Sequence, residues 1–95
     1  MNKLIVIEGL DGSGKSTQLE LLQKNLKNSG VDCKSVSFPA YESDSSVLVK
    51  MYLNGEFGSN PADVNIYSAS LFYAVDRYAS YMKHWKNDYE EGTII

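Results

Sequence analysis

Apolar positions in the first forty residues change their spacing twice. A short continuous apolar run at 3–7 predicts a buried strand, and apolar residues then recur at helical spacing between 19 and 26. The residues "NSG" at 28–30 indicate the end of this helix, and a second strand is expected over about 32–38. Strand, loop, helix and strand in this order form a βαβ unit, whose crossover favours parallel strands.

The remaining residues predict two more helices and the start of a third strand. Residues 43–46 are suited to cap a short helix over 47–52, and "NPAD" at 60–63 provides a cap, a first-turn proline and a first-turn acid for a long helix. The segment "NDYEEG" closes that helix, and "TII" at 93–95 begins the strand. The long helix carries an apolar stripe that is expected to face the core: Val64, Tyr67, Leu71, Val75, Tyr78 and Met82.

These elements predict an α/β fold with a parallel sheet, of which this chain carries about three strands. A parallel sheet needs both faces covered and its edges protected, and the predicted elements are too few for that. We therefore expect residues 1–95 to be the front portion of a single larger α/β domain.

Composition limits the classes of ligand and the location. The formal net charge of −3 argues against a broad surface for nucleic acid or anionic membrane, so an anionic ligand has to be held locally. Cys33 is the single cysteine, and we interpret it as a small buried residue in a reducing compartment. Glu8 interrupts the N-terminal apolar run before a signal-peptide core forms, and no stretch approaches the roughly 20 apolar residues of a membrane span. We expect a cytoplasmic protein.

The loop between the first strand and the first helix has a distinct chemistry. Gly9, Gly14, Lys15 and Ser16 fit the pattern G-x-x-x-x-G-K-[ST]. Glycines permit dihedral angles closed to other residues and leave backbone N–H groups open as an anion nest, which the helix dipole reinforces. Lys15 supplies a point charge for β- and γ-phosphate oxygens, and the Ser16 hydroxyl can bind Mg²⁺. The whole segment is therefore predicted to bind the nucleotide: Gly9, Leu10, Asp11, Gly12, Ser13, Gly14, Lys15, Ser16 and Thr17.

Asp11 is an unexpected residue in such a loop, because its carboxylate opposes the charge of a bound phosphate. From the residues alone, two interpretations stand equally. The carboxylate either accepts a hydrogen bond from a sugar hydroxyl or is a solvated acid or turn former. A dinucleotide site is excluded, because Thr17 stands where G-x-G-x-x-G requires its third glycine.

The chain resembles the thymidylate kinase family along its whole length. The resemblance rests on "EGLDGSGKST" at 8–17, "FP" at 38–39, "VLVKMYLNGEFG" at 47–58 and "LFYAVDRYAS" at 71–80. It implies a P-loop NTPase three-layer fold of the nucleoside monophosphate kinase type, with the lid and C-terminal half absent from this chain. It also implies phosphoryl transfer from MgATP to dTMP, giving dTDP, by an enzyme that is usually a homodimer.

The resemblance assigns roles to individual residues. It implies that Tyr73 stacks on thymine and that Arg77 hydrogen-bonds the base. Helical spacing supports this pair independently, because positions i and i+4 share a face and lie roughly 5–6 Å apart at Cβ. The residues alone leave open a simple surface stack of the two side chains. The implied acceptor-binding residues are Asp11, Phe38, Pro39, Tyr41, Tyr73 and Arg77, and the implied catalytic residues are Lys15 and Asp11.

The chain departs from the family pattern near the acceptor phosphate. Many members place an arginine in or beside "FP", where this chain has Ala40 and Tyr41, and some carry an arginine in the glycine loop, where this chain has Gly12. The lid arginine and the acidic motif of the family would lie beyond Ile95, so the 95 residues alone are expected to be inactive. Two alternatives remain: another nucleoside or nucleotide kinase, and a non-catalytic P-loop module in which the nucleotide only switches a binding surface.

Overall fold

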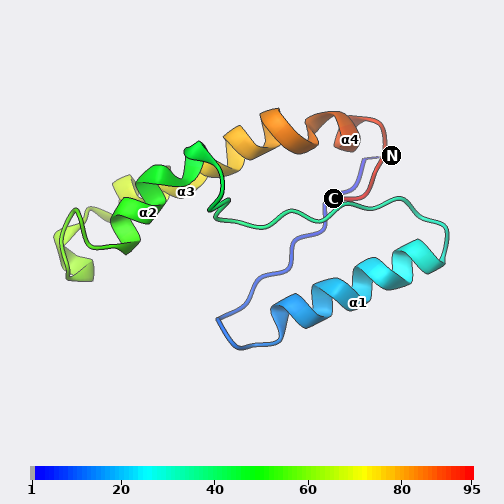
Figure 1. The fold of residues 1–95 in the computed structure, drawn as a ribbon, viewed down its shortest axis with the longest axis horizontal. Helices are drawn as coiled ribbons and strands as arrows, with labels where there is room; N and C mark the ends of the chain where they lie inside the picture. Colours follow the sequence, from blue (N-terminus) through cyan, green and yellow to red (C-terminus); the bar gives the residue numbers. More distant parts are fainter. Residues whose placement is uncertain (1) are drawn as a thin grey trace. The chain divides into compact units, whose positions relative to one another are not determined.

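The computed structural model describes residues 2–95, which divide into two compact units (Figure 1). The first unit comprises Met1–Val36 and Trp85–Ile95, and the second comprises Ser37–His84. Helices account for all regular elements of the described residues. In chain order these are α1 (Lys15–Asn28), the 3₁₀ helix η1 (Asp44–Ser46), α2 (Val47–Leu53), the 3₁₀ helix η2 (Pro61–Asp63), α3 (Ile66–Ser80), the π-helix η3 (Tyr81–Trp85) and α4 (Lys86–Glu90).

The predicted α/β fold with a parallel three-stranded sheet is wrong for this structure. Across residues 2–95 no strand forms, although an isolated parallel bridge joins Cys33 and Ile94 and further backbone hydrogen bonds join the extended segments. Ile94 exchanges backbone hydrogen bonds with residues 32 and 34 (3.1 and 2.8 Å), and Ile95 exchanges them with residues 3 and 5 (3.1 and 2.8 Å). The two outer segments thus pair through the short segment 93–95, which is too short to build a ladder with either. The predicted three-layer P-loop NTPase fold requires this sheet and is therefore not seen in residues 2–95 either.

The first helix is confirmed. Helix α1 begins at Lys15, immediately after Gly14, and its C-terminal cap is Ser29. The chain then reverses at Gly30, whose φ of 77° lies in the left-handed region that glycine adopts without steric cost. The N–H of Gly30 donates to the carbonyl of Lys27 at 3.0 Å, which satisfies one of the last carbonyls of the helix.

The long helix of the second unit begins later than predicted. Residues Pro61–Asp63 form the separate 3₁₀ helix η2 with Asn60 as its N-cap, and Val64 and Asn65 are extended. Helix α3 starts at Ile66 because the Asn65 side chain accepts hydrogen bonds from the N–H groups of Tyr67 (2.9 Å) and Ser68 (3.2 Å). The end is as predicted, since helical structure continues through η3 and α4 to Glu90.

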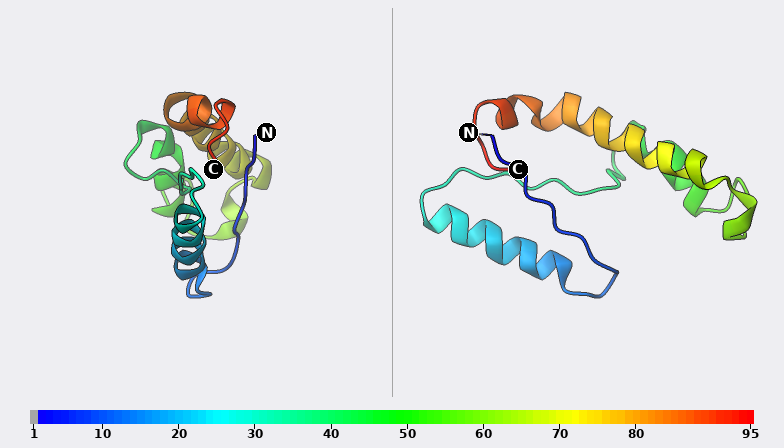
Figure 2. Two further views of the ribbon diagram at one scale, coloured as in Figure 1. Left: turned by 90° about the vertical axis from the view of Figure 1, so that its right-hand side faces the viewer. Right: turned by 180° about the vertical axis from the view of Figure 1, so that it is seen from behind.

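Helix α3 packs against η1 and α2 through the face opposite to the predicted one. Figures 1 and 2 show α2 running alongside α3. The buried residues of α3 are Ala69, Asp76 and Ser80, and their small or hydrogen-bonding side chains allow a close approach. The apolar stripe predicted to face the core is instead largely exposed: Tyr67 79%, Leu71 62%, Val75 54%, Tyr78 66% and Met82 47%.

No helix in the described part of the chain is both long enough and apolar enough to cross a membrane.

Candidate functional site

The glycine loop leaves open space in the first unit where side chains would otherwise stand. Gly12 and Gly14 have φ angles of 77° and 86°, and a Cβ added to either would meet nothing within 4 Å. Gly9 is different, because a Cβ there would lie 2.7 Å from the Ser13 hydroxyl oxygen. The loop therefore needs glycine for backbone conformation at two positions and for close approach at a third.

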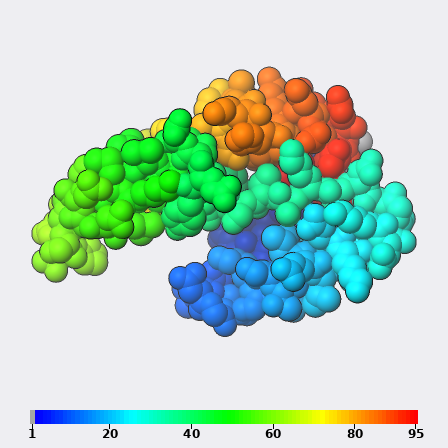
Figure 3. Space-filling model, viewed as in Figure 1, coloured from blue at the N-terminus to red at the C-terminus, as the bar shows by residue number. Residues whose placement is uncertain are grey.

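Backbone groups and one lysine define the chemistry of this loop. The N–H of Ser13 donates to the Leu10 carbonyl at 3.1 Å, and the Lys15 ammonium donates to the Gly9 carbonyl at 3.3 Å. Gly14 is the N-cap of α1 and has no side chain, so no side chain caps the first-turn N–H groups. The loop is exposed, and its atoms lie uncovered at the surface in blue (Figure 3).

These features fit a phosphate group. The uncapped N–H groups, the positive end of the α1 dipole and the Lys15 ammonium all favour an anion, and the open space beside Gly12 and Gly14 admits one. For Mg²⁺, the loop offers the Ser16 hydroxyl. Residues 2–95 hold no group of three or more His, Cys, Asp or Glu side chains suited to a metal ion.

Two of the residues predicted to bind the acceptor, Tyr73 and Arg77, lie on α3 in the second unit. Tyr73 is partly buried, and its ring meets that of Tyr52 edge to face with centroids 6.5 Å apart. Burial raises the pKa of the Tyr73 phenol, the phenols of Tyr52 and Tyr41 raise it further, and the Arg77 guanidinium opposes them. Tyr41, Tyr73 and Arg77 are thus electrostatic neighbours, with Tyr41 and Arg77 exposed.

Asp76 is a functional candidate that sequence reasoning missed. Its side chain is 1% exposed, and its two carboxylate oxygens accept hydrogen bonds from the Ala40 N–H (2.8 Å) and the Ser45 hydroxyl (2.6 Å). These partners lie 36 and 31 residues away in the chain, so no local pattern could reveal them. The one signal was an acid on α3 away from the apolar stripe, which is also typical of a solvated face.

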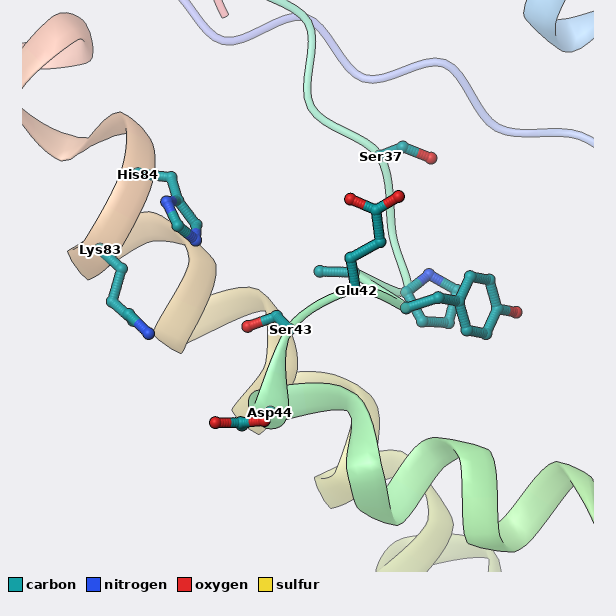
Figure 4. A pocket seen from close by; sticks show the side chains of 9 residues that line it. Ser37, Glu42, Ser43, Asp44, Lys83 and His84 are labelled. Atoms are coloured by element: carbon teal, nitrogen blue, oxygen red, sulfur yellow. The ribbon is translucent and has the colours of Figure 1, made fainter.

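A hollow of about 650 Å³ opens beside the segment that follows Pro39. Lys83 and His84 extend from η3, Glu42 and Ser43 come from the loop, and Asp44 comes from the start of η1 (Figure 4). Its charges are mixed, with two acids facing one lysine and one histidine, which does not favour a phosphate. It is lined by Ser37, Pro39, Ala40, Tyr41, Glu42, Ser43, Asp44, Lys83 and His84, so it includes two predicted acceptor residues but neither Tyr73 nor Arg77.

Comparison with known proteins decides which family carries this combination of loop and helix. The family model described as thymidylate kinase matches residues 7–95. The chain belongs to the thymidylate kinase family. This confirms the resemblance drawn from the sequence motifs.

Individual thymidylate kinases match different lengths of the chain. The thymidylate kinase of Plasmodium falciparum is 48% identical over 54 residues, which cover 57% of this chain and 26% of that protein. That of Halothermothrix orenii is 33% identical over 94 residues, covering 96% of this chain and 42% of that protein. The probable thymidylate kinase of Thermococcus gammatolerans is 31% identical over 97 residues, covering 100% of this chain and 47% of that protein.

The chain spans less than half the length of these thymidylate kinases. No solved structure matches it in the corresponding comparison.

The residues that the thymidylate kinase resemblance singled out fall into both units. The loop 9–17, with Asp11 exposed at its surface, lies in the first unit. In the second unit Phe38 and Tyr41 are exposed and Pro39 is half-buried, and the segment that carries them is bonded to Asp76 through the Ala40 N–H. The roles of these residues in binding donor or acceptor remain predictions.

Proposed function

We propose that residues 1–95 are the N-terminal portion of a single P-loop kinase domain, and that the intact protein transfers the γ-phosphoryl group of ATP to dTMP, giving dTDP. The observation that carries the proposal is the thymidylate kinase match over residues 7–95, because it includes both the glycine loop and the Tyr73–Arg77 pair. The reaction class is an in-line phosphoryl transfer without a covalent enzyme intermediate.

The donor side of the proposed reaction is held by the glycine loop. Its N–H groups would bind phosphate oxygens, and Lys15 would exchange its 3.3 Å bond to the Gly9 carbonyl for the β- and γ-phosphates. Magnesium held through the Ser16 hydroxyl would neutralise charge on the same oxygens. The residues of this loop thus act by positioning and charge neutralisation.

The acceptor side is held by α3 and the segment before η1. Tyr73 would stack on thymine, and Arg77 would donate hydrogen bonds to a base carbonyl. Asp11 would accept a hydrogen bond from the sugar hydroxyl, which explains a carboxylate in a loop that binds anions. Phe38, Pro39 and Tyr41 would border the acceptor nucleotide.

The proposal is tested by turnover in the full-length protein with a panel of dTMP, dUMP, dCMP, dAMP and dGMP as acceptors and MgATP as donor. We expect dTMP to have the highest kcat/KM. Lys15→Ala should lower kcat with dTMP by at least about a hundredfold, because the transferred phosphoryl group loses the flexible cation that neutralises its charge. Lys24→Ala, which removes an exposed lysine of α1, is the matched control and should stay near wild type.

Each alternative function predicts a different result from this panel. A preference for another acceptor would assign the protein to a different nucleotide kinase activity. ATP binding without turnover of any acceptor would indicate a non-catalytic P-loop module. Full activity of Lys15→Ala would exclude this lysine from the mechanism.

We also propose that the intact protein is a cytoplasmic homodimer that binds neither nucleic acid nor membrane. The exposed apolar stripe along α3 and η3 supports a protein partner, since five of its six side chains lie on one face and are about half exposed or more. The net charge of −3 supports the absence of a nucleic-acid partner.

A further inference from the structure

One buried carboxylate connects the acceptor segment to the helix that carries Tyr73 and Arg77. We propose that Asp76 is a positioning residue for the acceptor nucleotide, which holds segment 40–45 against α3 and thereby sets the spacing between Tyr41 on the segment and Tyr73 and Arg77 on the helix. The inference rests on the proposed function, because it concerns how the same site recognises its acceptor.

The two oxygens of Asp76 hold the two ends of this segment. Oδ2 accepts from the Ala40 N–H at 2.8 Å, and Oδ1 accepts from the Ser45 hydroxyl at 2.6 Å. Both distances are short, and hydrogen bonds to a carboxylate are about twice as strong as neutral ones. Asp76 is 1% exposed, so water has little access to its carboxylate. Loss of either donor therefore leaves a buried oxygen without a partner, which is costly.

The segment between these two ends is closed by hydrogen bonds of its own. The Ser43 N–H donates to the Ala40 carbonyl at 2.8 Å, and the Ser46 hydroxyl donates to the Ser43 carbonyl at 2.8 Å. The Ser43 and Ser45 hydroxyl oxygens lie 3.1 Å apart. Since the Ser45 proton goes to the carboxylate, the Ser43 hydroxyl donates to Ser45. These hydrogen bonds link the residues of the segment to one another, and Asp76 fixes the segment on α3.

The position of segment 40–45 affects recognition because Asp76, which holds the segment, lies close to Tyr73 and Arg77 along α3. Tyr73 and Asp76 occupy positions i and i+3 of α3 and Arg77 occupies i+4, so the carboxylate is a neighbour of Tyr73, which is in turn a neighbour of Arg77. Tyr41 directly follows the Ala40 N–H that Asp76 holds, and Tyr41 contributes to the raised pKa of Tyr73. A displacement of the segment by about 1 Å would misplace Tyr41 against the acceptor, and errors of that size are costly in catalysis.

The test compares four variants in the full-length protein: Asp76→Ala, Asp76→Asn, Ser45→Ala and the double variant. The kinetic readout is KM for dTMP and KM for ATP measured separately, with kcat. The structural readout is the hydrogen-exchange rate of the Ala40 amide, which reports whether the segment is held. Ser70→Ala, at an exposed serine on α3, is the matched control for Ser45→Ala.

We expect the dTMP KM to rise about threefold in Ser45→Ala and at least about tenfold in Asp76→Ala, with faster exchange at Ala40 in both. Asp76→Asn should remain within about threefold of wild type, because the amide oxygen still accepts from Ala40 and the amide N–H can donate to Ser45. The ATP KM should change less than about twofold throughout. The double variant should match Asp76→Ala, since the two residues act through one contact.

A purely structural role would lower the melting temperature and the active fraction while leaving both KM values in place. That result, or equal shifts of the two KM values, would overturn the inference. If Asp76→Ala does not fold, Ser45→Ala and Asp76→Asn decide by the same criteria. Wild-type protein without dTMP turnover would refute the proposed function and the inference together, whereas normal turnover with an unchanged dTMP KM in Ser45→Ala and Asp76→Ala would refute the inference alone.

Discussion

At the scale of single residues, two cations of this chain are suited to different tasks. Lys15 is a flexible point charge whose 3.3 Å bond to a carbonyl is long and exposed, so a phosphate can readily replace it. Arg77 is the only arginine, and its planar guanidinium can direct several donors toward one acceptor. Its position four residues after Tyr73 joins directional hydrogen bonding to a stacking surface.

Replacing Arg77 with alanine should reduce discrimination between bases. Thymine presents a carbonyl where cytosine presents an amino donor, so the guanidinium favours dTMP and opposes dCMP. We expect Arg77→Ala to cost dTMP about 1.5–3 kcal/mol in kcat/KM, the range for a hydrogen bond to a charged group, and to cost dCMP much less. Measurement of kcat/KM for both nucleotides checks this.

Two further variants separate base reading from other contacts of this pair. Arg77→Lys should recover little, since an ammonium lacks the planar fork. Tyr73→Ala should lower kcat/KM for both nucleotides by similar factors, because every base can stack on the ring. If Arg77→Ala instead lowers kcat/KM for dTMP and dCMP by one common factor, the guanidinium contacts the phosphate or the sugar.

At the scale of elements, prediction succeeded where the signals were local. Helix α1 and its loop were predicted from residues 9–30 alone, because glycine, lysine and the apolar spacing all lie within the element. The start of α3 was misplaced because Asn60 and Asn65 both suit a cap, and only the extended backbone at Val64 and Asn65 separates the two helices. The bridge between Cys33 and Ile94 joins segments that lie far apart in the sequence. The periodicity of either segment therefore does not show that their pairing stops at an isolated bridge.

The packed face of α3 could not be predicted either, because apolarity pointed to the other side. The stripe around Leu71 and Val75 satisfies every rule for a core face, yet η1 and α2 pack on the side of Ala69 and Asp76. Hydrogen bonds to a buried acid fix segment 40–45 on that side, and a sequence pattern does not show such long-range partners. For the candidate site, the sequence singled out Tyr73 and Arg77, whose roles stay predictions, and it did not single out the buried carboxylate of Asp76.

The exposed stripe on α3 leads to a prediction about assembly. If the stripe forms the interface of a homodimer, a carboxylate introduced at its centre would be buried there without a counter-charge. Leu71→Glu should then raise the dimer dissociation constant of the full-length protein by at least about a hundredfold. Sedimentation velocity over a range of concentrations measures this constant.

The neighbouring substitution Ser70→Glu provides the control for this assembly test. It adds the same charge to the same helix at an exposed position outside the stripe, and should leave the constant nearly unchanged. A Leu71→Glu protein that dimerises like wild type would show that the stripe does not form the interface.

At the scale of the whole molecule, the described residues bury few apolar side chains. Val49, Ala69, Trp85 and Ile95 form the buried hydrophobic set, divided between the two units. Many large apolar residues of both units are exposed, among them Leu4, Val6 and Leu10 in the first. Burial of apolar area is the main favourable term in folding, and it has to offset about 1–2 kcal/mol of backbone entropy for each ordered residue.

The 95 residues in isolation should therefore lack a stable monomeric fold. We expect a broad, non-cooperative thermal transition by circular dichroism, and association that increases with concentration as exposed apolar surfaces meet. Calorimetry and sedimentation of the same samples check the two expectations separately, and a longer protein that includes residues 1–95 serves as the comparison. Saturating MgATP should not restore a sharp transition in the isolated chain, because a ligand at the glycine loop contributes only RT ln(1 + [L]/Kd). A sharp cooperative melt from a monomer at low concentration would contradict this prediction and show that the two units bury enough surface to fold by themselves.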